Sequence, residues 1–132
     1  MDNITQAEFK NKSALSVKAL MEKRELIQRN KKRMIDIEVD EIGVFRFRIP
    51  DFYDIEDSNQ TDNGDAYIVY SCAVEPSLKD AELQKAYGVK MPVDIVLEIF
   101  KPGQIVEITK TLLQAAGYKD ETVRIVETIK NE

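Results

Sequence analysis

Residues 34–49 read MIDIEVDEIGVFRFRI, and apolar residues alternate with charged residues along both halves of this stretch. Because neighbouring side chains on a strand point to opposite faces, this alternation predicts two β-strands, each with one apolar face. Gly43 lies in the short loop between the halves, which is typical of an antiparallel hairpin. We therefore predict a hairpin over residues 34–49. An isolated hairpin is marginally stable in water, so helices must cover its apolar face.

The charges predict a register for this hairpin. If Asp40 pairs with Val44 around a three-residue loop, with Gly43 in the left-handed conformation, one face is apolar and the other pairs opposite charges. A shift by one residue would place charged side chains on the apolar face, so this register is favoured over that one. The predicted apolar pairs are Val39–Phe45, Ile37–Phe47 and Ile35–Ile49, and the predicted charged pairs are Glu38–Arg46 and Asp36–Arg48.

Before the hairpin, residues 13–30 have the periodicity of an amphipathic helix, with Ser13 as the expected N-cap. An amphipathic helix near a chain end can dock on another molecule, so Leu20 and Ile27 are candidates for partner binding or self-association. Residues 1–12 have no sustained periodicity and are expected to be flexible. The apolar stripe of the helix consists of Val17, Leu20, Met21 and Ile27.

The basic run Lys31-Lys32-Arg33 comes at the predicted end of this helix. Cations are favourable there because the C-terminal end of the helix dipole is negative. Contact with nucleic acid or with an acidic partner is the alternative interpretation. The net charge of −5 argues against nucleic acid, since nucleic-acid-binding domains normally carry a basic face.

Pro50 ends the second strand, and an acidic, turn-rich stretch follows it through Gly64. Within this stretch, Phe52, Tyr53 and Ile55 predict one helical turn against the core, and the remainder is predicted to be a loop. The carboxylates lack the ligand spacing of an EF-hand, so we interpret them as a solvated loop rather than a calcium site.

Residues 66–74 are apolar on every side, and periodicity does not distinguish a buried helix from a buried strand here. The predicted helical part of the chain spans 66–130. Its first clear helix begins after the N-cap Asp80 and ends at Gly88 in the left-handed conformation. Pro92 begins the next helix, whose predicted buried stripe is Val93, Val96, Leu97 and Phe100.

A longer helix follows Pro102-Gly103, with Gly117 as its C-cap. Tyr118 is expected to fold back over its last turn. A final helix is predicted to open at Asp120 or Glu121. The predicted inward residues of the longer helix are Ile105, Ile108 and Leu112, and those of the final helix are Thr122, Ile125, Val126 and Ile129.

The composition restricts the chemistry. The chain has 132 residues, which predicts a single domain over 1–132. It has no histidine and a single cysteine, Cys72, which we interpret as an inert core thiol. The common general base and every Ser-His or Cys-His nucleophile are therefore missing, and we expect neither enzymatic activity nor a cofactor. No apolar run approaches the ~20 residues that a membrane span needs, so we expect a cytoplasmic protein.

Several motifs occur together in residues 66–118. They are Cys72 before Glu75-Pro76, Leu78, the run DAELQ at 80–84, Tyr87-Gly88-Val89, Pro102-Gly103 and Ala116-Gly117-Tyr118. With these motifs, the helical part resembles the XkdN-like tail assembly chaperones of phages and prophages. The resemblance implies a transient chaperone that binds the tape measure protein, recruits tail tube subunits and is absent from the mature virion.

Three residues of this part, Tyr87, Met91 and Phe100, are candidates for a groove that binds a partner helix, and their alternative interpretation is as core residues. A structural tail component or small adaptor that stays in the particle is the second hypothesis for function. A small DNA-binding regulator is the third, and an enzyme is the least favoured. The fold predicted from all these signals is α+β, mostly helical, with one N-terminal antiparallel hairpin packed against short helices.

Overall fold

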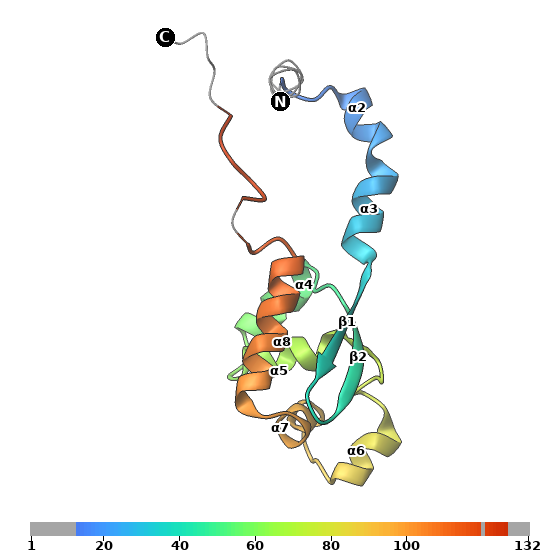
Figure 1. The fold of residues 1–132 in the computed structure, drawn as a ribbon, viewed down its shortest axis with the longest axis vertical. Helices are drawn as coiled ribbons and strands as arrows, with labels where there is room; N and C mark the ends of the chain where they lie inside the picture. Colours follow the sequence, from blue (N-terminus) through green and yellow to red (C-terminus); the bar gives the residue numbers. More distant parts are fainter. Residues whose placement is uncertain (1–12, 120, 127–132) are drawn as a thin grey trace.

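The computed structural model describes residues 13–119 and 121–126, which form an α+β fold that is mostly helical, as predicted (Figure 1). A three-stranded antiparallel sheet with the order β1-β2-β3 packs against helices. In order, the elements are α2 (Val17–Glu22), α3 (Arg24–Lys32), β1 (Met34–Val39), β2 (Gly43–Arg48), α4 (Phe52–Asn59), α5 (Gly64–Cys72), β3 (Ala73–Glu75), α6 (Ala81–Tyr87), the 3₁₀ helix η1 (Pro92–Asp94), α7 (Ile95–Ile99) and α8 (Pro102–Ala115).

The predicted helix over 13–30 is two helices, α2 and α3, and this part of the prediction was wrong. The backbone bends at Lys23, whose N–H is shared between the carbonyls of Ala19 and Leu20. Ser16, and not Ser13, is the N-cap, because its hydroxyl oxygen accepts a hydrogen bond from the N–H of Ala19 at 3.0 Å. The prediction for residues 1–12 falls outside the described residues.

The hairpin is present, but its register differs from the predicted one by two residues. Ile35 lies opposite Phe47, and Asp36 lies opposite Arg46. The three-residue loop consists of residues 40–42, and it is Glu41 that takes the left-handed conformation (φ 69°). A shift by two residues leaves every side chain on its face, so the alternation could not reveal it. The shift pairs Asp36 with Arg46 and places Arg48 opposite Met34, so Arg48 does not pair with Asp36 as predicted.

The ambiguous stretch 66–74 contains both kinds of structure. Helix α5 runs to Cys72, and the chain then extends as β3, which pairs with β2. The sheet therefore has a third strand beyond the single predicted hairpin. Because α5 is covered by the sheet and by other helices, its residues are buried on several sides, which explains its uniformly apolar sequence.

The stretch after Pro50 contains more helix than predicted. Asp51 and Asp54 form a capping box, in which each carboxylate accepts a hydrogen bond from the backbone N–H of the other, and α4 extends over two turns. Phe52 and Tyr53 do not pack on the core as predicted, because they lie on the solvent side and are 68% and 70% exposed.

The core lies between one face of the sheet and helices α5, α7 and α8 (Figure 1). Thr109 of α8 donates a hydrogen bond to the carbonyl of Asp65 at the start of α5, at 3.2 Å. Among the described residues, the largest fully buried side chains are Phe47, Val69, Cys72, Leu78, Ile95, Val96 and Leu112.

The predicted N-cap Asp80 and the left-handed Gly88 of α6 are confirmed. The C-cap of α8 is Ala116 rather than the predicted Gly117, which follows it with a positive φ of 103°. Two further predictions for the C-terminal helices were wrong. The 3₁₀ turn at η1 rotates the following helix, so Ile95 is buried and Leu97 is 49% exposed. Residues 121–126 are not helical, in contrast to the final helix predicted from Asp120 or Glu121, and the rest of that prediction falls outside the described residues. The chain does fold back at Tyr118, whose backbone N–H donates a hydrogen bond to the carbonyl of Leu113 at 2.9 Å.

Replacing Gly88 with alanine should destabilise the fold by about 1 kcal/mol, because Gly88 ends α6 in the left-handed conformation (φ 67°). Gly103 of α8 is the matched control: a Cβ at either glycine would meet nothing within 4 Å, so the two variants differ in backbone conformation alone. Gly103→Ala should be neutral or slightly stabilising in urea denaturation. Equal effects of the two substitutions would contradict this account of Gly88.

Candidate protein-binding surfaces

Arg48 joins three elements of the body, which we define as residues 34–119. These elements are β2, α4 and α5. The Arg48 guanidinium binds the Asp54 carboxylate through two hydrogen bonds, of 2.6 and 3.0 Å, and donates a third to the carbonyl of Ser71 at 3.1 Å. Burial opposes ionisation of Asp54, but the hydrogen bonds from Arg48 and from the Asp51 backbone outweigh it, so the Asp54 pKa lies below its usual value. The end of β2 is thereby fixed to the start of α4 and to α5.

The described residues hold little reactive chemistry. Burial raises the pKa of the Cys72 thiol to about 12, so this cysteine is a protonated core residue at neutral pH. Within residues 13–119 and 121–126, no three side chains of aspartate, glutamate, histidine or cysteine form a group suited to a metal ion. No helix in the same ranges is long and apolar enough to cross a bilayer.

The first surface is the arm, which we define as helices α2 and α3. The arm extends away from the rest of the described chain (Figure 1), and neither helix contains a buried residue. Leu20 is 52% exposed and Ile27 is 40% exposed. Lys23 and Lys31 lie one turn before and after Ile27, so apolar and basic side chains share one helix face.

The second surface is the α6–η1 corner, which we define by Tyr87 and Met91. These side chains are 46% and 61% exposed, whereas Val89 and Val93 beside them pack against the core. The Gln84 side-chain amide links the two sides of this corner, because it donates to the carbonyl of Leu78 before α6 at 2.9 Å and to the carbonyl of Pro92 in η1 at 3.5 Å.

The five predicted site residues do not form one site. Leu20 and Ile27 lie on the arm, and the corner lies at the opposite end of the described structure (Figure 1). Phe100 is 4% exposed and its ring packs 5.1 Å from that of Phe45, so it belongs to the core and not to a surface.

The third surface, which the sequence analysis missed, is the α4 face. It consists of Phe52, Tyr53, Glu56 and Asp57, whose positions i, i+1, i+4 and i+5 share one side of the helix. The two rings meet edge to face with centroids 5.7 Å apart. The opposite side of α4 carries the buried Asp54 and Ser58. The Asp51-x-x-Asp54 capping box was the sequence signal for this helix.

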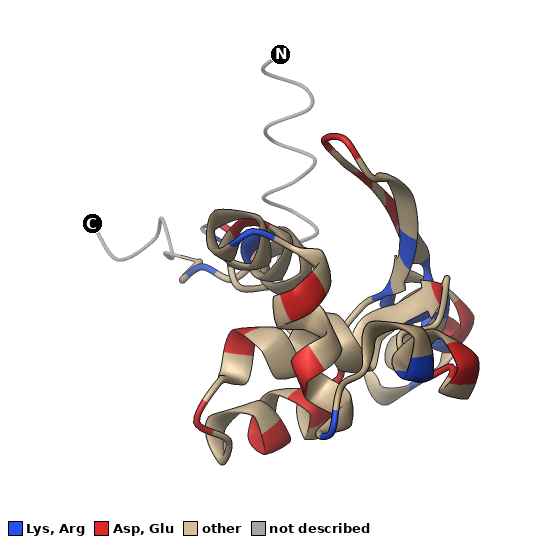
Figure 2. Ribbon diagram, turned by 90° about the horizontal axis from the view of Figure 1, so that it is seen from below, with Lys and Arg blue, Asp and Glu red and all other residues tan. Residues whose placement is uncertain are grey.

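The arm and the body have opposite charge. Residues 16–33 contain seven basic and two acidic side chains, a net charge of +5, whereas residues 34–119 contain eight basic and sixteen acidic ones, a net charge of −8. Acidic segments outnumber basic ones over the helices of the body seen from below (Figure 2). The overall charge of −5 therefore conceals a strongly polarised molecule.

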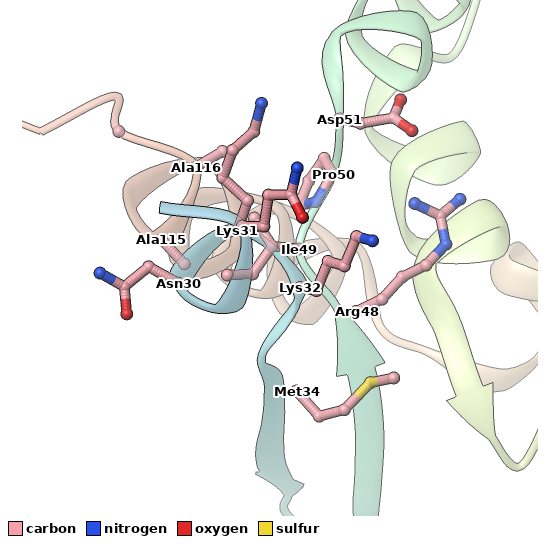
Figure 3. Close-up of a pocket in the computed structure, with 12 residues that line it drawn as sticks. Asn30, Lys31, Lys32, Met34, Arg48, Ile49, Pro50, Asp51, Ala115 and Ala116 are labelled. Carbon is pink, nitrogen blue, oxygen red and sulfur yellow. The ribbon is translucent and has the colours of Figure 1, made fainter. Parts of the chain in front are cut away.

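An open groove of about 810 Å³ lies where the arm meets the body (Figure 3). It is bordered by the end of α3, the start of β1, the residues after β2 and the end of α8. Lys31 and Lys32 line this groove and lie in the last turn of α3, where they complement the negative end of that helix's own dipole. This explains the basic run Lys31-Lys32-Arg33 without a nucleic-acid contact.

Fold and surfaces together define a small α+β protein with exposed apolar and charged faces. The family model of the phage XkdN-like tail assembly chaperone proteins matches residues 8–130, so the chain belongs to this family. A search of the curated proteins and a search of the solved structures each returned no significant match.

Proposed function

We propose that this tail assembly chaperone binds the tape measure protein through the α6–η1 corner and brings tail tube subunits to it in the host cytoplasm. Membership of the family supports the general role. The observation that favours the corner is the exposure of Tyr87 and Met91 above a packed apolar layer. Such a surface suits an amphipathic helix, which binds by inserting apolar side chains at helical spacing.

Replacing both Tyr87 and Met91 with alanine should weaken binding of the tape measure protein by about tenfold or more, because exposed aromatic anchors contribute strongly to interfaces. The measurement is co-expression with the tape measure protein of the same tail gene cluster, followed by size-exclusion chromatography and titration. Val106→Ala on α8, where Val106 is 51% exposed, is the matched control and should bind normally.

The proposal would be overturned if the wild-type chain and the tape measure protein were both soluble but eluted separately. Mass spectrometry of purified tails decides between the two roles. We expect the chain to be absent from mature tails, and its presence there would favour a retained structural component or adaptor.

A further inference from the structure

The arm lacks the support that a helix of its length needs. Helices of six and nine residues are marginal in water unless they pack against something. The arm has an apolar stripe, but within the described residues nothing covers it, and all its large apolar side chains are at least 40% exposed.

The α4 face is complementary to the arm in charge, and it too has exposed apolar side chains. The arm combines leucine, isoleucine and methionine with lysine and arginine, whereas the α4 face combines two exposed aromatic rings with two carboxylates. In the row Lys23, Ile27 and Lys31, an apolar side chain lies between two cations. On α4, Glu56 lies one turn after Phe52 and Asp57 one turn after Tyr53.

We propose that the arm of one copy docks on the α4 face of a second copy. In this contact the apolar side chains of the arm pack against Phe52 and Tyr53. The lysines and arginines of the arm lie against Glu56 and Asp57. Aromatic rings beside the basic groups add cation–π attraction. Contact within one chain is disfavoured because Arg33 alone separates α3 from β1, and this short connection directs the arm away from the body (Figure 1).

The contact joins two different surfaces, and it can be satisfied in two ways. Two copies can exchange arms and close a dimer, or each copy can bind the next and form an open chain. Both arrangements leave the α6–η1 corner uncovered by the contact itself. The inference does not depend on the proposed binding of the tape measure protein and is tested on the purified chain alone.

Sedimentation of the full wild-type chain should show reversible association that increases with protein concentration. Raising the salt concentration should weaken the association, because exposed charges at the interface are screened. A chain that stays monomeric at low salt, up to the highest concentration at which it is soluble, would overturn the proposal.

Two charge-reversed variants identify the surfaces. Lys23→Glu/Arg24→Glu changes the arm at the start of α3, where acidic residues are compatible with the helix dipole. Glu56→Lys/Asp57→Lys changes the α4 face; its lysines remain exposed, at the cost of the 3.2 Å hydrogen bond from Tyr67. Each variant alone should raise the dissociation constant at least about tenfold.

Mixing the two variants should restore association, because the native arm of one meets the native α4 face of the other. Lys110→Glu on α8 is the matched control and should associate like the wild-type chain. Arm-to-arm contact would leave the α4 variant associating normally, and that result would overturn the proposal. Failure of the mixture to associate, with both variants folded by circular dichroism, would also overturn it.

Discussion

The Phe47→Ala chain should lose about 3–5 kcal/mol of unfolding free energy, which is a large part of the stability of a domain of this size. Phe47 has no exposed surface, and it lies on the central strand β2, between β1 and β3. Its ring packs 6.1 Å from that of Phe45. Truncation therefore opens a cavity where the sheet meets the helices, and neighbouring strands restrict how far the site can collapse.

Urea denaturation of wild-type and variant chains measures this loss. Val44→Ala is the matched control on the same strand, because Val44 is 60% exposed on the opposite face. That substitution should cost well under 1 kcal/mol. A Phe47→Ala chain that unfolds at the wild-type midpoint would show that the core is not organised around β2.

Replacing Arg48 with methionine should destabilise the fold by about 3 kcal/mol, because it leaves the Asp54 carboxylate buried without its cation. The contrast with Arg46 is informative. Arg46 makes a similar two-bond pair with Asp36, but both partners are solvent-exposed, so Arg46→Met should change stability little. Adding Asp54→Asn to Arg48→Met should recover part of the loss, since the buried charge is removed.

This pair also predicts a dependence on pH. The pKa of Asp54 is lower in the folded chain than its usual 3.8, so the carboxylate contributes stability above that pH. That contribution should be lost as the pH falls below 3.8 and through the folded value. In the Arg48→Met variant, the loss of unfolding free energy with falling pH should be smaller, because the pKa of Asp54 in the folded chain rises once Arg48 is removed. Denaturation midpoints measured at pH values on both sides of 3.8 check this, and parallel curves would contradict it.

The sequence predicted the hairpin because both faces of β1 and β2 carry a clear period of two. It predicted the wrong pairing because Gly43 was placed in the loop in the left-handed conformation. Gly43 does have a positive φ, of 139°, but it begins β2 opposite Val39, and Glu41 takes the left-handed conformation in the loop. The ion pair between Arg48 and Asp54 could not be predicted from the alternation along the strands, since Asp54 belongs to the next helix, α4. Non-local contacts of this kind decide between registers that the local pattern leaves equal.

The surfaces were predicted less completely than the fold. Exposure of Leu20, Ile27, Tyr87 and Met91 agrees with a binding role, which remains a prediction, whereas Phe100 is a core residue. Phe52 and Tyr53 are predicted from the sequence to form, with Ile55, one helical turn against the core, but both are exposed. Their exposure follows from the Asp51 cap, which fixes the phase of α4 and turns Asp54 and Ser58 inward instead.

The arm has a consequence for how this protein can change over evolutionary time. Because α2 and α3 bury none of their residues, substitutions there remove no core contact and should cost the body almost no folding free energy. Changes in what the arm contacts are thus separable from changes in how the sheet and its covering helices fold. The side chains of the arm can change together with those of the α4 face, on which we propose that the arm docks, while selection on the core residues of the sheet and helices continues undisturbed.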